Sequence, residues 1–320
     1  MVVLTEGCDY LNLRSNAFDN KPRDYDVYHD ESLEHGFWHG ILFVPRDSRK
    51  RLLTLLANIR QSTDRFHPLS LKNLNKTTGK LYKCTSCWLQ VGVAALIQDF
   101  KGRAYATPTG ADGQWAQYLP FDQLVRARFV LFRVKGGLGP LNLCHDYAAK
   151  VETTFRMAFK GGLTMFSRED EELCIRSLYF DGHKHYHRRL DLRRVLRDIG
   201  TPPTRVHLHD EIELSDDSSD HREAGAQPYD DCQLLQLTDI LVSGFRTILA
   251  EAPAPEAHRE VSRPLSELVD KWNRGRKGFS YSRWFKGFCV SEGYIEDGQW
   301  QFGAIEPDYE ILQTELFDNG

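Results

Sequence analysis

Three aspartates occupy positions where a packed protein rarely places an acid. Asp30 and Asp181 each end an apolar, strand-like stretch, and Asp239 interrupts the apolar helical pattern that begins at Cys232. A buried carboxylate is costly unless it is paired or ligates a metal ion. Converging carboxylates are the oxygen ligands that Mg²⁺ and Mn²⁺ prefer. Because two such ions about 3.5–4 Å apart promote hydrolysis of a phosphodiester bond, the three acids predict a Mg²⁺- or Mn²⁺-dependent phosphodiester hydrolase.

The elements that would position these acids form an α/β pattern. Alternating or β-rich stretches predict strands at residues 24–32, 37–45, 127–135, 173–182 and 204–214. Helical patterns predict helices at residues 48–61, 80–100, 145–160, 183–200 and 232–249. Two antiparallel strands come first, and crossover units follow. If the first and fourth strands are neighbours, Asp30 and Asp181 stand at the same edge of the sheet, where the last helix can bring Asp239.

Smaller residues indicate where these elements start and stop. Asp47 or Ser48 is the expected N-cap of the first helix. The Gly161–Gly162 pair predicts the end of the helix that starts at residue 145. Residues 102–120 are rich in Gly, Thr and Pro, which predicts a loop. The last sixty or so residues predict a short helix and an aromatic, β-like tail.

Two short motifs resemble those of a known family. The sequence YHDES at residues 28–32 and the sequence LLQLTDILVSGF at residues 234–245 resemble the opening D-E-S and closing Q-L-x-D signatures of the domain-of-unknown-function 3800 family. That family belongs to the ribonuclease H-like superfamily. Its members share a mixed five-stranded sheet of order 3-2-1-4-5, flanked by helices, and an acidic cluster that resembles the cluster of metal-dependent nucleases. The resemblance spans roughly residues 24–250.

The resemblance implies a role for each acid. Asp30 matches the first-strand acid of the family, Asp181 the fourth-strand acid and Asp239 the acid of the closing helix, so these three are the expected metal ligands and catalytic residues. Glu31 also matches the motif and is a further catalytic candidate. Because side chains alternate along a strand, Glu31 is expected to point away from Asp30. In ribonuclease H enzymes a glutamate of the first crossover helix completes the site, and Glu152 is the nearest candidate by sequence order.

The chain departs from the family pattern at two places. Leu33 stands where the family often has glycine after D-E-S. After its fifth strand the family tends to carry D-S-K, whereas this chain offers Asp217 and Ser218 without the lysine. Both departures concern the positioning of substrate more than the acid cluster.

Two basic segments are candidate contacts for a nucleic-acid backbone. Residues 182–205 hold seven Lys or Arg against two acids, and residues 263–286 hold seven against two with aromatic side chains between them. Basic groups hold phosphates, and aromatic rings stack on single-stranded bases. A solvated helix face explains the first segment equally well, and docking of the tail onto its own domain or a partner protein explains the second. The residues expected to bind nucleic acid are Lys184, Arg188, Arg189, Arg274, Lys277 and Trp284.

Histidine and cysteine clusters offer a different type of metal site. His183, His185 and His187 alternate along the chain. On a continuous strand all three would share a face and suit zinc, whereas a helix would bring only the first and third together. Cys84 and Cys87 form a C-x-x-C pair, but no second pair stands at a zinc-binding spacing. The other interpretation of the pair is two small residues on one side of a helix.

Length and charge set limits on these interpretations. The chain has 320 residues, more than the ~100–200 of an ordinary domain. We expect one ribonuclease H-like domain at residues 1–250, with a helical insertion at about 46–100 and a C-terminal extension at 258–320. A net charge of −4 excludes a globally basic nucleic-acid binder. No apolar run approaches the ~20 residues of a membrane span, and the start lacks a signal-peptide pattern, so a cytoplasmic protein without membrane contact is expected.

Two functions from different classes follow. The leading hypothesis is a Mg²⁺- or Mn²⁺-dependent nuclease that acts on RNA or DNA in a bacterial defence or mobile-element system. The alternative is a non-catalytic adaptor of the same fold, which binds a protein partner or nucleic acid through its C-terminal extension. A zinc-stabilised binding module built on the histidines is a third interpretation, and a homo-oligomer is compatible with all three.

Overall fold

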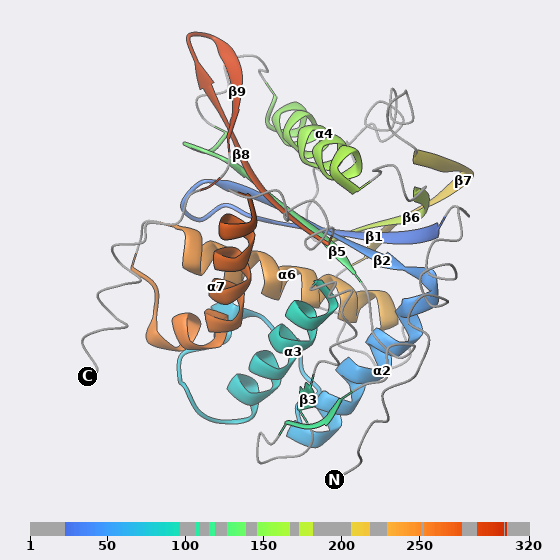
Figure 1. Ribbon diagram of the computed structural model, residues 1–320, viewed down its shortest axis with the longest axis vertical. Helices are drawn as coiled ribbons and strands as arrows, with labels where there is room; N and C mark the ends of the chain where they lie inside the picture. Colours follow the sequence, from blue (N-terminus) through green and yellow to red (C-terminus); the bar gives the residue numbers. More distant parts are fainter. Residues whose placement is uncertain are drawn as a thin grey trace, which may run out of the picture.

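The computed structural model shows an α/β protein in which a mixed β-sheet lies between two layers of helices (Figure 1). The α/β class and the mixed sheet flanked by helices are therefore confirmed. The structure describes residues 23–96, 106–108, 115–118, 127–138, 146–166, 173–181, 206–217, 229–250, 253–276, 287–303 and 305.

The main sheet has seven strands among the described residues, in the order β7-β6-β1-β2-β5-β8-β9. β2 is antiparallel to both β1 and β5, and β9 is antiparallel to β8. The pairs β1–β6, β6–β7 and β5–β8 are parallel. All five strands expected from the sequence are present, and β8 and β9 extend the sheet beyond β5. The bounds are β1 Arg23–Ser32, β2 Phe37–Pro45, β5 Arg128–Val134, β6 Leu173–Asp181, β7 Val206–Asp217, β8 Phe288–Glu296 and β9 Gln299–Gly303.

β1 and β2 form a tight hairpin that carries most of the residues of interest. Gly36 in its turn has a φ of 122°, which glycine adopts without strain. The antiparallel register pairs Asp30 with Gly40 and Glu31 with His39. A slip by one residue would move every side chain of the strand to the other face. Because the two faces of the sheet pack against different cores, such a slip is unfavourable and the register is fixed.

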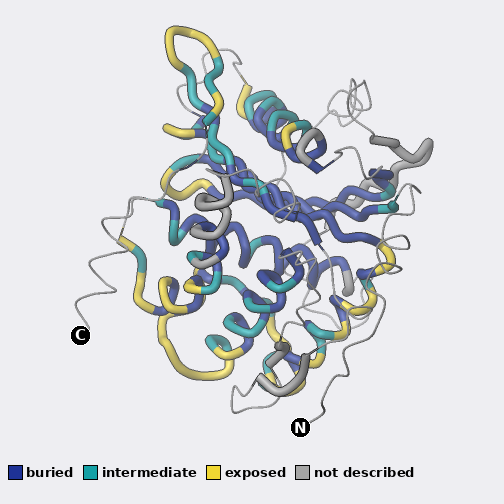
Figure 2. Tube along the Cα trace, in the orientation of Figure 1, coloured by how far each residue is buried: buried dark blue, intermediate teal, exposed yellow. Residues whose placement is uncertain are grey.

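Of the described helices, α4 (Tyr147–Phe166) covers one face of the sheet and four helices cover the other (Figure 1). Each face has its own core of buried apolar side chains, and alternate residues of the strands contribute to each core. Figure 2 shows that most of the central sheet is buried. On β1, Tyr28 belongs to the core on the α6 side and Val27 to the core on the α4 side. The four helices are α2 (Arg46–Thr63), α3 (Lys80–Leu96), α6 (Tyr229–Leu249) and α7 (Glu256–Arg276), and a short 3-10 turn, η1 (Leu71–Asn73), lies between α2 and α3.

The end of α4 differs from the sequence prediction. The Gly161–Gly162 pair predicts a helix end, yet the helix continues to Phe166. The reason is a contact with the sheet: a Cβ atom at Gly162 would lie only 2.2 Å from Cγ2 of Val130 on β5. Glycine therefore lets the helix approach the strand closely, and this packing outweighs the cost of about 1 kcal/mol for glycine inside a helix.

Two further predictions about local structure are corrected. Pro45 stands at the N-cap of α2, and the side chains of Asp47 and Ser48 do not cap the helix. Asp47 instead lies in the first turn, where its charge interacts favourably with the helix dipole. The segment predicted as a loop contains β-forming residues that pair antiparallel, in strands β3 (Ala106–Pro108) and β4 (Trp115–Tyr118).

The C-terminal segment joins the main sheet and its α6-side core. β8 pairs parallel with β5, and α7 buries Val261, Leu265 and Leu268. Gly244 permits close contact between α6 and α7, since a Cβ atom there would lie 2.6 Å from Cδ1 of Leu265. The helix predicted as short has 21 residues. Within the described ranges, no helix has the length and apolar character needed to cross a bilayer.

Candidate metal centre

Asp30 lies on the side of the sheet that α6 covers. The residues that precede and follow it on this side of β1 contact α6 directly. The Tyr28 hydroxyl donates to Asp231 Oδ1 at 2.7 Å, and Arg246 Nη1 donates to Ser32 Oγ at 2.6 Å. Asp30 stands between these contacts and is only 5% exposed. Its carboxylate is therefore buried on the α6 side, where a charge is stable only with partners or a bound cation.

Asp239 stands at the matching place on α6. It lies between Asp231 and Arg246, whose hydrogen bonds to β1 are given above, and shares a helix face with Arg246 two turns later. Asp239 is partly exposed, and its Oδ1 accepts a hydrogen bond from Ser243 Oγ at 3.3 Å. The contacts on either side of the two acids therefore bring Asp30 and Asp239 to the same region between strand and helix.

The backbone places Asp181 next to Asp30 at one edge of the sheet. The parallel strands β1 and β6 pair His29 with Phe180, so Asp30 and Asp181 follow as the next residues of each strand. On the next parallel strand, β7, Asp217 pairs with Asp181. Three neighbouring strands therefore carry an aspartate at the same edge. Asp217 was not among the predicted ligands, and the signal that could have found it is its place at the end of the fifth strand.

Glu31 lies on the opposite side of the sheet, as alternation along the strand predicts. Its carboxylate approaches His29 and His39, and the potential ligand atoms of these three buried residues all lie within 4.8 Å of one another. Glu152 belongs to α4, which covers this same side (Figure 1). The structure therefore places neither Glu31 nor Glu152 on the α6 side with Asp30.

The residues predicted to contact nucleic acid fall almost entirely outside the described residues. Arg274 lies in the last turns of α7, and at this position only the backbone is described. The basic surfaces and the histidine cluster of the C-terminal half therefore stay predictions. The predicted residues outside the described ranges are Lys184, Arg188, Arg189, Lys277, Trp284, His183, His185 and His187.

A buried polar network holds β1 in place before Asp30. Arg49 of α2 donates to Asp231 Oδ1 at 2.7 Å and to the Tyr28 hydroxyl oxygen at 3.2 Å. Burial, and next the charge of Asp231, hold the pKa of Tyr28 well above its usual value, so the phenol stays protonated and donates. Its ring stacks on Tyr179 of β6 at a centroid distance of 4.8 Å. Tyr28 and Asp231 are 203 positions apart, so no local pattern joins them.

Gly40 sets how closely α6 approaches the strand at Asp30. A Cβ atom at Gly40 would lie 1.9 Å from Cγ2 of Val242 on α6 and 3.0 Å from Cζ of Phe129. We expect Gly40→Ala to lower the free energy of unfolding by about 1–3 kcal/mol, because helix and strand must separate to accept the methyl group. In a Val242→Ala background the same substitution should cost less. Urea unfolding of the four proteins in this cycle measures both effects.

The matched control for Gly40→Ala is Gly161→Ala. Gly161 is exposed and helical, and nothing lies within 4 Å of a Cβ atom there. Alanine at this position should be neutral or stabilise the helix by up to about 1 kcal/mol. A Gly40→Ala protein as stable as the wild type, or an equal cost in both backgrounds, would contradict the close approach of α6.

Cys84 and Cys87 are packing residues of α3. Both thiols are free, Cys84 is buried and Cys87 is half-buried. Burial raises the pKa of the Cys84 thiol and raises the pKa of Cys87 to about 11. Because the thiolate is the metal ligand and the nucleophile, these shifts disfavour a zinc or redox role. At pH 8 we expect iodoacetamide to modify Cys87 roughly 100-fold more slowly in the native protein than in urea. Peptide mass spectrometry measures both rates, and equal rates would contradict the shift.

The chemistry available where β1, β6 and β7 end follows from the carboxylates that these strands and α6 carry. Asp30 supplies a buried carboxylate, α6 carries Asp239, and the ends of β6 and β7 carry Asp181 and Asp217. All are hard oxygen donors, which fit Mg²⁺ or Mn²⁺ better than zinc. No protein-family model and no curated protein matches the chain, so its function has to be argued from this arrangement of acids.

Proposed function

We propose that this protein is a nuclease that hydrolyses phosphodiester bonds of RNA or DNA with Mg²⁺ or Mn²⁺. The observation that carries the proposal is the buried carboxylate of Asp30, with Asp181 as its neighbour in the strand register. Asp239 on α6 completes the set of three ligands. Carboxylates brought together in this way repel one another unless they are paired or hold a cation, and a divalent cation is the partner we propose.

The strand order supports a ribonuclease H-like fold. In chain order, the first five strands of the main sheet are β1, β2, β5, β6 and β7, and in space they lie as β5-β2-β1-β6-β7. This agrees with the 3-2-1-4-5 order implied by the resemblance to the domain-of-unknown-function 3800 family. We therefore infer that the chain is a member of that family in which β8 and β9 extend the sheet beyond β5.

Each residue of the site has its own task in this proposal. Asp30, Asp181 and Asp239 hold the ions, which when bound polarise the phosphate and make a water more acidic. Ser243 holds the Asp239 carboxylate by its hydrogen bond. Arg246 anchors the end of β1 to α6 and so keeps the strand and helix ligands at a constant separation.

The substrate backbone is proposed to run past the strand edge. Lys184, Arg188 and Arg189 follow Asp181 closely in the sequence, and basic side chains bind phosphates, so we propose these three as contacts of the backbone. A second contact comes from the C-terminal half, through Arg274, Lys277 and Trp284. Glu31 has no task at this site, because its side chain lies with His29 and His39 on the α4 side.

A cleavage assay tests the proposal. Labelled RNA, DNA and RNA–DNA hybrid are incubated with the purified protein and Mg²⁺, Mn²⁺ or EDTA. We expect cleavage with either metal and none with EDTA, and we expect Asp239→Asn to abolish it. Cleavage that survives EDTA or the substitution would contradict the proposed site. Failure to cleave any of the three substrates with both metals would favour the non-catalytic adaptor instead.

A further inference from the structure

A second cluster of metal-ligating side chains lies on the α4 side of the sheet. His29 and Glu31 are alternate residues of β1, and His39 of β2 pairs with Glu31 in the register. Their potential ligand atoms all lie within 4.8 Å of one another. His29 and His39 are 0% exposed and Glu31 is 7% exposed. Two adjacent strands thus hold two imidazoles and one carboxylate together, which we name the His29–Glu31–His39 triad.

A hydrogen bond to Thr154 orients the ring of His39. The hydroxyl of Thr154 on α4 donates to a carbonyl of the preceding helical turn, with the oxygens of Lys150 and Val151 at 2.9 and 3.1 Å. A hydroxyl has one hydrogen, so when a carbonyl accepts it, the 2.8 Å contact with Nε2 of His39 is donated by the ring N–H. A neutral ring then carries its lone pair on Nδ1, which faces Nε2 of His29 at 2.9 Å. Outer partners orient metal-bound histidines in the same way.

We propose that the His29–Glu31–His39 triad binds a divalent transition-metal ion of the zinc type. Two imidazoles and a carboxylate form a ligand set that suits zinc, whereas Mg²⁺ prefers oxygen alone. Ligation at about 2.0–2.1 Å places neighbouring ligand atoms roughly 3.0–3.4 Å apart. The two facing ring nitrogens are 2.9 Å apart and the Glu31 oxygen lies within 4.8 Å of the histidine ligand atoms, so ligation requires the two rings to turn toward the ion and the carboxylate to move closer. The site is independent of the proposed nuclease centre, because the sheet separates it from Asp30.

Aromatic rings surround the triad and make its environment apolar. Phe155 and Phe180 lie against His29 at ring-centroid distances of 4.7 and 5.4 Å, and Phe37 lies 4.8 Å from His39. An apolar environment raises the cost of burying the carboxylate of Glu31. A bound cation offsets that cost, and it gives the two buried histidines and the glutamate a common function.

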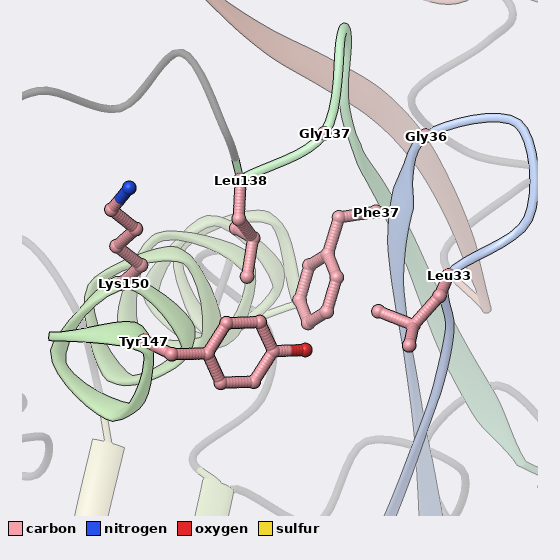
Figure 3. A pocket seen from close by; sticks show the side chains of 7 residues that line it. All are labelled: Leu33, Gly36, Phe37, Gly137, Leu138, Tyr147 and Lys150. Atoms are coloured by element: carbon pink, nitrogen blue, oxygen red, sulfur yellow. The ribbon is translucent and has the colours of Figure 1, made fainter.

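A pocket on the same side of the sheet shares neighbouring residues with the triad. It has a volume of about 340 Å³, and its lining includes Leu33, Phe37 and Lys150 (Figure 3). Phe37 belongs to both features, since its ring contacts His39. Lys150 lines the pocket too, and its backbone oxygen lies 2.9 Å from Oγ1 of Thr154, the residue that contacts His39. The pocket is lined by neighbours of the triad and by none of its three members.

Titration of the full-length protein with Co²⁺ tests the proposal. Co²⁺ occupies zinc sites and gives visible absorption bands that depend on the ligand set. We expect one Co²⁺ to bind at the triad, to be displaced by Zn²⁺ and to remain in the presence of excess Mg²⁺. A wild-type protein without these bands, or bands that Mg²⁺ removes, would overturn the proposal in favour of a hydrogen-bonded histidine pair without an ion.

Substitutions then locate the ion. Glu31→Gln keeps the size of the side chain and removes its charge, and we expect it to weaken Co²⁺ binding about 100-fold. His39→Gln should do the same, whereas His35→Asn, at an exposed histidine of the same hairpin, should change nothing. If the His39→Gln protein does not fold, the Glu31→Gln protein and the wild-type titration still show whether the ion binds at the triad. Binding that survives Glu31→Gln overturns the assignment.

A second control addresses the other histidine cluster of the chain. Substitution of that whole cluster by asparagine should leave the Co²⁺ bands unchanged. Loss of the bands in this protein would mean that the ion binds there and would overturn the assignment to the triad. The substituted residues are His183, His185 and His187.

Discussion

Asp30→Asn is expected to lower Mg²⁺-dependent cleavage of nucleic acid by about 10²–10³-fold. The amide keeps the shape of the side chain but loses its negative charge, so the site holds its ions more weakly. Metal ions contribute several kcal/mol to such transition states, and each 1.4 kcal/mol is about a factor of ten in rate. Initial rates at saturating Mg²⁺ on the labelled substrates measure the loss.

The stability of Asp30→Asn separates a ligand role from a structural role. Without metal, neighbouring carboxylates repel, so the neutral amide should leave the urea midpoint unchanged or raise it. Asp297→Asn is the matched control, because Asp297 is exposed in the β8–β9 turn and has a φ of 51°, which asparagine tolerates. Full activity in Asp30→Asn, or an equal loss in Asp297→Asn, would contradict the assignment of Asp30.

The strands and most helices could be predicted because their signals are local. β1 and β2 alternate or are β-rich, and the turn between them contains Gly36, so the hairpin depends on residues close in sequence. Gly162 illustrates the limit. A glycine pair is typical of a helix end, and only the position of Val130 on β5 explains why the helix continues. Contacts between distant segments override local preference here.

The two groups of candidate ligands differ in how visible they are in the sequence. Asp239 stands out because it is a charge within an apolar helix. His29 and Glu31 are alternate residues of one strand, so the sequence indicates that they share a face. Two ligands alone do not predict a metal site. The third, His39, joins them only through the register of the hairpin. Counting residues across the turn at Gly36 would have found the triad.

Arg60→Met is expected to lower the free energy of unfolding by about 3–5 kcal/mol. Arg60 of α2 is 3% exposed and its guanidinium donates hydrogen bonds to four acceptors. Two are side-chain oxygens of Gln233 and Gln236 on α6, and two are backbone oxygens of Arg65 and His67. Methionine fills similar space but donates no hydrogen bond. Each buried acceptor that loses its donor costs about 1–3 kcal/mol.

Two further substitutions identify the cause of this loss. Arg60→Lys keeps the charge but not the planar guanidinium group. It should therefore lower the free energy of unfolding, but by less than Arg60→Met does. Arg51→Met changes an exposed arginine of the same helix and should stay within about 0.5 kcal/mol of the wild type. Urea unfolding ranks the three proteins, and a loss below about 1 kcal/mol for Arg60→Met would contradict the network.

The same substitution connects α2 to the proposed site. Gln236 accepts from Arg60 at 2.7 Å and from the backbone N–H of Leu69 at 3.0 Å, and it stands one turn before Asp239 on α6. Loss of Arg60 therefore removes a contact that holds α6 at the turn that carries Asp239. We expect Arg60→Met to reduce cleavage even under conditions where the protein stays folded, whereas Arg51→Met keeps full activity. A folded Arg60→Met protein with wild-type activity would show that the contact between α2 and α6 stabilises the fold without supporting the site.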